Sequence, residues 1–236
     1  MKHSITHVIF DVDGLLLDTE VIYSAIACEL LEKYGLKINY ELKRKIMGRK
    51  PIEAATALVE GLSAPFTPEE WMTNYKKHLT TERWHAVESL PGAKRLVLHL
   101  AKQNIPMAAA TGCCLNELEE KMFNHQDIWK HLEHAVASGD DPTILRGKPA
   151  PDIFIAAAQR FREPPCNFES VLVFEDSPLG VQAAVEAKMH VVWVPCAEEP
   201  PGVAPETISS EDAWRVTRLR SLLDFQPKQF GIPAFG

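Results

Sequence analysis

The sequence lacks any block of lysine and arginine. Its 25 basic residues are scattered among 32 acidic ones, and the formal charge is −7. Such a surface is poorly suited to neutralising nucleic-acid phosphates or to binding anionic lipid. We therefore expect no nucleic-acid partner and no membrane partner, and we expect a small molecule or a metal-bound ligand instead.

Long apolar runs are also missing. No run approaches the ~18 residues of a membrane span, and the N-terminal stretch MKHSITHVIFDVDG has no apolar segment of signal-peptide length. The five cysteines, an odd number, contain no C-x-x-C pair and no histidine at zinc spacing. These absences favour a cytoplasmic protein with reduced thiols, and its 46% apolar content suffices for a hydrophobic core.

Short apolar runs alternate with helix-like segments along much of the chain. The runs predict strands at residues 6–10, 105–111, 134–138, 170–176 and 190–195. Apolar residues at three-and-four spacing predict helices at 92–103, 115–124, 151–161 and 178–188. This alternation predicts an α/β fold, a Rossmann-like parallel sheet with helices on both faces.

One region breaks the alternation, because residues 18–87 show helix signals and no convincing strand. In the segment TPEEWMTNYKKHL, Thr67 and Glu70 have the spacing of a capping box. The simplest interpretation is a small all-helical cap inserted after strand 1, with residues 1–17 and 88–236 forming the α/β catalytic core. We expect hinges at 15–20 and at about 85–91, and cap closure over the core would exclude bulk water.

Polar residues stand at the ends of three predicted strands. They are Asp11 and Asp13 after HVIF, Thr111 at the end of PMAAAT, and Glu175 with Asp176 after VLVF. Ligands of an open parallel sheet collect at the carboxyl ends of its strands, near the point where strand order reverses. We expect these side chains at one edge of the sheet, with Lys148 in the loop RGKPAPD beside them.

Such a group of side chains suits phosphoryl transfer. Clustered carboxylates repel one another unless a divalent cation neutralises them, and oxygen-only ligands suit Mg²⁺. A hydroxyl and an ammonium at the same edge suit the remaining phosphoryl oxygens. Each residue also has an ordinary interpretation, such as a strand-to-turn Asp, a helix N-terminal acid pair or a solvated loop lysine. Because these residues stand together at one edge of the predicted sheet, we favour a phosphoryl-transfer site.

The same stretches resemble a known family. DVDGLLLDTE, the strand-terminal Thr111, GKPAPDIF and VFEDSPLGVQAA match in order and spacing the four motifs of the haloacid dehalogenase-like hydrolase superfamily. The match spans most of the chain. In addition, MGRKPIEAA, GDDPTILRGKPAPDIFIAAAQRF and LLDFQPKQFGIPAF resemble the branch that contains pseudouridine 5′-phosphatase and its relatives.

The resemblance implies a role for each motif residue. Asp11 is the implied nucleophile that forms an aspartyl phosphate, and Asp13 the acid for the leaving alkoxide and then the base for water. Thr111 and Lys148 are implied to hold phosphoryl oxygens, and Lys148 also to offset the charge on Asp11. Gly14 is implied to permit a sharp turn.

The resemblance also implies the Mg²⁺ ligands. These are the carboxylates of Asp11 and Asp176 and the backbone carbonyl of Asp13, with Glu175 as a further or outer-shell ligand. Gly112 stands where the family usually has a small polar residue after the strand-terminal threonine, and its backbone N–H is still available to phosphate.

Two further positions bear on the substrate. A dehalogenase needs no acid two residues after its nucleophile, whereas ester cleavage at neutral pH benefits from one, so Asp13 indicates phosphate esters. Arg49 and Lys50, in the turn MGRK of the cap, are either ordinary surface charges or groups that reach over the site to the substrate.

The sequence therefore predicts a Mg²⁺-dependent phosphatase acting on a small phosphate monoester through an aspartyl phosphate. Pseudouridine 5′-phosphate is the leading substrate by resemblance alone. Sugar phosphates, glycerol phosphate and a phosphomutase activity of the same superfamily are alternatives. A non-catalytic phospho-ligand binder would be expected to have lost Asp11 or Asp13, and both are present. We expect a monomer or a weak homodimer.

Overall fold

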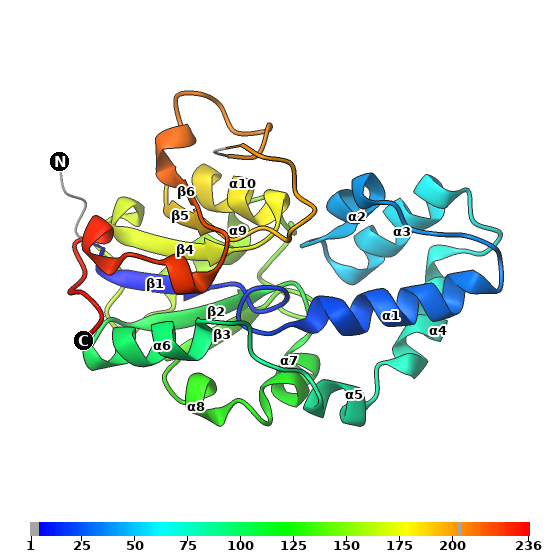
Figure 1. Cartoon of the computed structure of the whole chain (residues 1–236), viewed down its shortest axis with the longest axis horizontal. Helices are drawn as coiled ribbons and strands as arrows, with labels where there is room; N and C mark the ends of the chain where they lie inside the picture. Colours follow the sequence, from blue (N-terminus) through cyan, green and yellow to red (C-terminus); the bar gives the residue numbers. More distant parts are fainter. Residues whose placement is uncertain (1–4, 203) are drawn as a thin grey trace.

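A computed structural model describes residues 5–202 and 204–236 (Figure 1). Residues 1–4, at the start of the expected core, lie outside the described residues. Six parallel strands form one sheet in the order β3-β2-β1-β4-β5-β6. The strands are β1 (His7–Phe10), β2 (Met107–Thr111), β3 (His134–Ala137), β4 (Val171–Glu175), β5 (His190–Trp193) and β6 (Val216–Arg218).

The predicted fold class is confirmed. Each of the five predicted strands overlaps an observed strand, and the chain passes from β1 to β3 on one side of the sheet and from β4 to β6 on the other. Strand β6 was not predicted, because its three residues are too few to show a periodic pattern. No helix in the described part of the chain combines the length and the apolar composition of a membrane span.

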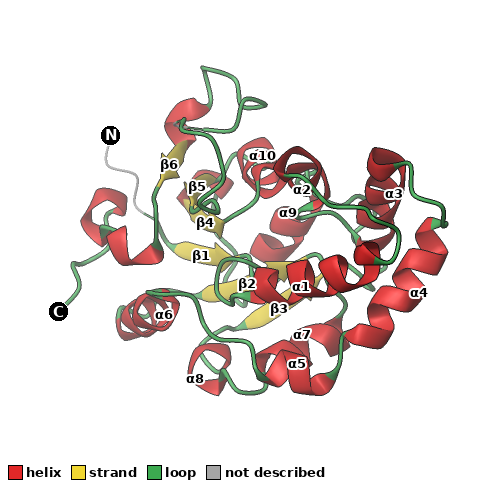
Figure 2. Cartoon of the chain, turned by 45° about the vertical axis from the view of Figure 1, so that its right-hand side comes forward, coloured by secondary structure: helices red, strands yellow, loops and turns green. Residues whose placement is uncertain are grey.

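Helices cover both faces of the sheet (Figure 2). They are α6 (Ala93–Lys102), α7 (Leu115–Met122), α8 (Gln126–Trp129), α9 (Asp152–Gln159) and α10 (Pro178–Glu186). The side chains of Val8 and Phe10 join the apolar cluster beneath α6, α7 and α8, whereas Ile9 joins the cluster beneath α9 and α10. Because both faces are buried, the strand reads as an unbroken apolar run.

The chain between β1 and α6 forms a helical segment. It contains α1 (Thr19–Glu32), α2 (Tyr40–Ile46), α3 (Pro51–Leu62), α4 (Pro68–His78) and α5 (Thr81–His85). Helices α1 to α4 share an apolar cluster of their own that includes Ile26 and Trp71, whereas Trp84 of α5 joins the cluster beneath α6, α7 and α8. The predicted capping box is present at α4. The Thr67 hydroxyl accepts a hydrogen bond from the Glu70 amide at 3.1 Å, and the Glu70 carboxylate accepts one from the Thr67 amide at 2.8 Å.

Two neighbouring stretches of chain connect this helical segment to the sheet. The amide of Asp18 donates to the carbonyl of Glu88, and that of Leu90 to the carbonyl of Leu16, both at 2.9 Å. The two connections therefore run side by side as a short hydrogen-bonded ribbon. That residues 18–87 act as a cap hinged at this ribbon remains a proposal.

Candidate active site

The carboxyl ends of β1 and β4 bring three carboxylates together. Asp11 follows β1, Glu175 is the last residue of β4, and Asp176 comes next. The two strands are neighbours in register, at the point where the strand order reverses. One oxygen from each carboxylate lies within 4.8 Å of the others, and all three side chains are buried. The geometry of this group fits oxygen-ligated divalent cations.

Two glycines leave room for the acids. Gly14 has a φ of +77°, and a Cβ atom on it would lie 2.5 Å from Oδ2 of Asp176. Gly180, in the first turn of α10, lies so close to Glu175 that a Cβ there would lie 1.7 Å from Oε1. Any other residue at these positions would displace a carboxylate. Gly14 was singled out from the sequence, whereas Gly180 was not, because its role depends on a contact across the loop.

Lys148 supplies positive charge to the acids. Its Nζ donates to Oδ1 of Asp11 and to Oε1 of Glu175, each at 2.5 Å, and its side chain is 2% exposed. Burial alone would lower the pKa of Lys148, but the two carboxylates raise it above its ordinary value. The other oxygen of Glu175 accepts bonds from the amide and hydroxyl of Ser177, at 2.7 and 3.0 Å. Both oxygens of Glu175 are thus engaged by protein groups.

One lysine does not neutralise three acids. Burial, with the charges of Glu175 and Asp13, raises the pKa of Asp11 to about 7 against the pull of Lys148. Burial and the neighbouring acids likewise hold the pKa of Asp176 well above its usual range. The protein alone therefore favours the protonated forms of Asp11 and Asp176 over those of ordinary carboxyl groups, and a bound divalent cation would favour their carboxylate forms.

The side chain of Asp13 points away from this cluster. Its Oδ2 accepts a bond from the Thr111 hydroxyl at 2.9 Å, and its Oδ1 accepts one from Nζ of Lys121 at 2.8 Å. Burial would raise the pKa of Asp13, but the Lys121 ammonium and these hydrogen bonds bring it below the ordinary value. Lys121 escaped the sequence analysis because it follows Glu117 by four residues in α7, a spacing typical of exposed ion pairs.

The loop after β2 lies beside Asp13. The Cys113 amide donates to the Thr111 hydroxyl at 3.3 Å, which closes a tight turn around Gly112. Burial raises the pKa of the Cys113 thiol, so this cysteine is no ready nucleophile. A side-chain carbon at Gly112 would lie 3.3 Å from the backbone carbonyl of Arg49. The helical segment therefore reaches this loop through its backbone.

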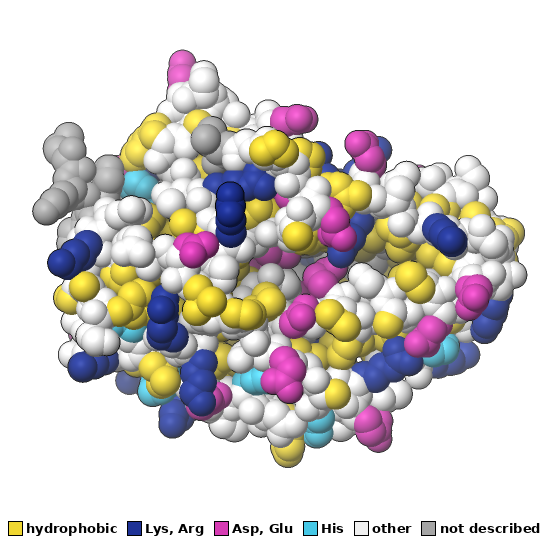
Figure 3. Space-filling view, in the orientation of Figure 1, with side chains coloured by type: hydrophobic (Ala, Val, Ile, Leu, Met, Phe, Trp, Pro, Cys, Tyr) yellow, Lys and Arg dark blue, Asp and Glu magenta, His cyan; other side chains and the backbone are white. Residues whose placement is uncertain are grey.

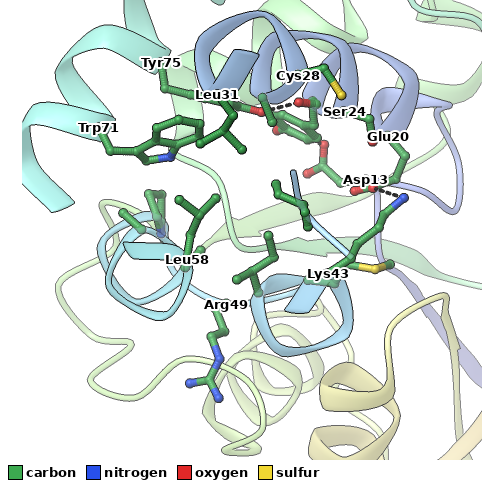
Figure 4. A pocket seen from close by; sticks show the side chains of 18 of the residues that line it. Asp13, Glu20, Ser24, Cys28, Leu31, Lys43, Arg49, Leu58, Trp71 and Tyr75 are labelled. Carbon is green, nitrogen blue, oxygen red and sulfur yellow. Dashed lines mark hydrogen bonds and ion pairs between the residues drawn. The ribbon is translucent and has the colours of Figure 1, made fainter. Parts of the chain in front are cut away.

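Arg49 and Lys50, the two residues of the helical segment singled out from the sequence, have different partners. The Arg49 side chain donates to the carbonyl of Lys45 at 2.6 Å, and its guanidinium points away from the cavity in Figure 4. Nζ of Lys50 donates to the carbonyl of Ile144 at 2.7 Å and so ties the helical segment to a loop of the α/β part. In this arrangement both cations are occupied by the protein itself.

A cavity of about 950 Å³ lies between the helical segment and the sheet edge. Acidic side chains surround a hollow in the middle of the face drawn in Figure 3. Asp13 lies at one end of the cavity and Trp71 with Leu58 at the other (Figure 4), and Asp11 and Asp176 also line it. The cavity therefore has a charged end and an apolar end.

The chain is similar to several known proteins. A family model described as "Haloacid dehalogenase-like hydrolase" matches residues 8–194. "(DL)-glycerol-3-phosphatase 2" of Arabidopsis thaliana is 42% identical over 236 residues, covering 99% of this chain and 94% of that protein. "Probable pseudouridine-5'-phosphatase" of Drosophila melanogaster is 39% identical over 232 residues, covering 98% and 96%. The crystal structure of CbbY from Rhodobacter sphaeroides with phosphate shares the fold, with a TM-score of 0.69, 21% identity and coverage of 93% and 96%.

Proposed function

The chain belongs to the haloacid dehalogenase-like hydrolase family and is a phosphoric monoester hydrolase, and from this premise we propose that it uses Mg²⁺ and an aspartyl phosphate on Asp11. The family predicted from the four motifs is confirmed. The observation that carries the proposal is the buried group of Asp11, Glu175 and Asp176 with Lys148 bonded to it. Lys148 pairs with two of these acids, Asp11 and Glu175, and not with Asp176.

The same contacts support the assignment of ligands. Asp11, Asp176 and the backbone carbonyl of Asp13 would hold Mg²⁺, which when bound supplies positive charge to the phosphoryl oxygens and the acids. Glu175 acts from outside this set, because Lys148 and Ser177 occupy its two oxygens. Its part is to hold Lys148 over Asp11.

The residues divide the reaction into two displacements. In the first, Oδ of Asp11 forms a bond to phosphorus as the bond to the alcohol oxygen breaks. Asp13, whose protonated form the negative charge of a bound phosphoryl group would favour, gives that oxygen a proton. In the second, Asp13 takes a proton from water, whose oxygen bonds to phosphorus as the Asp11 bond breaks. Thr111, the Gly112 amide and Lys148 bind the phosphoryl oxygens throughout.

The size and lining of the cavity support a substrate larger than glycerol phosphate. About 950 Å³ and an apolar end that includes Trp71 suit an alcohol with a flat, partly apolar group. We take pseudouridine 5′-phosphate as the first candidate, in agreement with the relative 39% identical. Glycerol 3-phosphate is the second, because the relative 42% identical is named for it.

A panel of nucleoside, sugar and glycerol phosphates tests the function. With Mg²⁺ present, we expect stoichiometric inorganic phosphate and free alcohol, with the highest kcat/KM on pseudouridine 5′-phosphate. A phosphomutase would instead return the phosphoryl group to the substrate and release little phosphate.

The cytoplasmic location and the monomer or weak homodimer remain predictions.

A blocking substitution is expected to separate the two candidate substrates. Ser24 is exposed and lines the cavity from α1 (Figure 4). A phenylalanine there would fill space beyond the reacting atoms, so Ser24→Phe should lower kcat/KM for pseudouridine 5′-phosphate about tenfold or more while sparing glycerol 3-phosphate. Ala25→Phe, at the next exposed residue and outside this cavity, is the matched control. Equal losses on both substrates would count against binding of the base in the cavity.

The raised pKa of Asp11 predicts a pH-dependent effect of the metal. The pKa of Asp11 is about 7 in the folded protein, against an ordinary value of 3.8, so the native state without metal retains a proton that the unfolded chain has lost. Its free energy of unfolding therefore falls as pH rises from about 4 to about 7. Mg²⁺ competes with that proton and should bind more tightly as pH rises.

We expect the stabilisation by Mg²⁺ to grow with pH by up to ~1.4 kcal/mol per pH unit for each proton displaced, until the pKa of Asp11 is passed. Adding Mg²⁺ should therefore raise Tm more at about pH 8 than at about pH 5.5. Differential scanning fluorimetry with and without Mg²⁺ measures this difference. Asp11→Asn, which cannot titrate, should reduce the slope. An increase in Tm that is independent of pH in the unmodified chain would refute the assignment of Asp11 as a ligand.

A further inference from the structure

Lys121 is fully buried although it lies in a short helix at the protein surface. The exposed fraction of its side chain is 0%. Its Nζ contacts three oxygens, which are Oδ1 of Asp13 at 2.8 Å, the hydroxyl of Tyr23 at 2.6 Å and Oε1 of Glu117 at 2.6 Å. A lysine pays a large desolvation cost to reach such a position, so a specific set of partners must hold it there.

Aromatic rings of the helical segment enclose this ammonium. Nζ lies 4.7 Å from the ring centre of Trp84 in α5 and 5.2 Å from that of Tyr23 in α1. Both residues belong to the segment inserted between β1 and β2, whereas Lys121 belongs to α7 of the α/β part. Lys121 thus meets Asp13 where the helical segment joins the sheet.

The two oxygens of Asp13 are held from different sides. Thr111 bonds to Oδ2, and Lys121 bonds to Oδ1. The Tyr23 hydroxyl also donates to Oδ1, at 3.3 Å, and that hydroxyl is itself bonded to Lys121 and, at 2.8 Å, to Glu117. Without Lys121, Oδ1 would lose a contact of 2.8 Å and keep the longer one from Tyr23, so the carboxylate could rotate more freely.

We propose that Lys121 is a positioning residue that fixes the side chain of Asp13 in the orientation from which, in its protonated form, it transfers a proton to the departing alcohol. This inference rests on the proposed role of Asp13. Lys121 does not line the cavity and so acts through Asp13, while Tyr23 and Glu117, which do line it, hold the ammonium in place. Small displacements of a proton donor have large effects on rate, because the transfer requires hydrogen-bond distance in the transition state.

The test uses leaving groups that differ in their need for a proton. An alkoxide requires protonation as it leaves, whereas p-nitrophenolate does not. Because kcat/KM reports the first displacement, Lys121→Met should lower it about 10- to 100-fold on an alkyl phosphate and less than about threefold on p-nitrophenyl phosphate. A purely structural role would lower both equally, and that result would overturn the inference.

Two further variants complete the experiment. Lys121→Arg keeps the charge and should recover part of the alkyl phosphate activity. Tyr23→Phe keeps the ring but removes the hydroxyl on Lys121, and it should show the same selective loss to a smaller degree. If Lys121→Met fails to fold, Tyr23→Phe decides the matter, and an equal loss on the two substrates would again overturn the inference.

A double-mutant cycle separates this inference from the function on which it rests. In an Asp13→Asn background, Lys121→Met should cause no further loss on the alkyl phosphate, because the group it positions is already disabled. A further loss of the full size would overturn the positioning role alone. If Asp13→Asn by itself leaves alkyl phosphate turnover unchanged, the proposed role of Asp13 fails instead.

Discussion

Asp11→Asn is expected to lower phosphate release by about 10⁴-fold or more while leaving the fold intact. An amide oxygen is too poor a nucleophile to displace an alkoxide from phosphorus, and no other described carboxylate is placed to replace it. Glu175 is engaged by Lys148 and Ser177, and Asp13 is turned toward Thr111 and Lys121.

Stability should change little in this variant, for an electrostatic reason. The substitution removes one contact of Lys148, whose Nζ keeps Glu175 at 2.5 Å, and it also relieves repulsion among three buried acids. We expect a Tm within a few degrees of the unmodified chain, together with loss of the aspartyl phosphate in intact-protein mass spectrometry after rapid acid quenching.

Asp224→Asn, at an exposed acid of the C-terminal region, serves as the matched control. It makes the same chemical change and should leave kcat/KM within about twofold. Turnover by Asp11→Asn near the unmodified rate, in protein free of deamidated material, would mean that another group attacks phosphorus.

The sequence allowed prediction of those parts of the site that lie next to strands in the chain. Asp11, Thr111 and Glu175 could be placed because a buried parallel strand is a continuous apolar run, and its end marks a sheet edge. The helix boundaries were predicted to within a few residues where a capping residue or a proline marked them, as at Thr67.

The sequence failed to reveal contacts between segments that are far apart in it. Lys121 and Glu117 have the spacing of an exposed helical pair, and only the packing of Tyr23 and Trp84 against α7 makes that lysine part of a buried network. For Arg49 the sequence left two interpretations open, a surface charge or a group that reaches the substrate, and in the structure its side chain donates to the carbonyl of Lys45. Side-chain direction depends on tertiary neighbours that periodicity does not encode.

Lys148→Met is expected to damage stability as well as activity, unlike Asp11→Asn. Methionine fills a similar volume but leaves Asp11 and Glu175 buried without their cation. Removing one partner of a buried ionic group typically costs about 3–5 kcal/mol. We also expect kcat/KM to fall by about 10³-fold or more, since the phosphoryl oxygens and the attacking carboxylate lose the same positive charge.

The origin of the instability can be tested by restoring charge balance in two ways. Adding Asp11→Asn to Lys148→Met removes one of the uncompensated acids and should recover part of the lost free energy of unfolding, with no recovery of activity. Lowering the pH should act in the same direction. Acids whose pKa is raised in the folded state bind protons there first, so the deficit of Lys148→Met should shrink from about pH 8 to about pH 5.

Urea unfolding at both pH values, with Lys228→Met at an exposed lysine as the control, measures these differences. If the deficit came from lost packing of the side chain rather than from charge, it would be independent of pH and unaffected by Asp11→Asn. Recovery of stability without recovery of turnover would show that Lys148 has two separable effects: it stabilises the folded acids, and it supplies charge to the reaction that they perform.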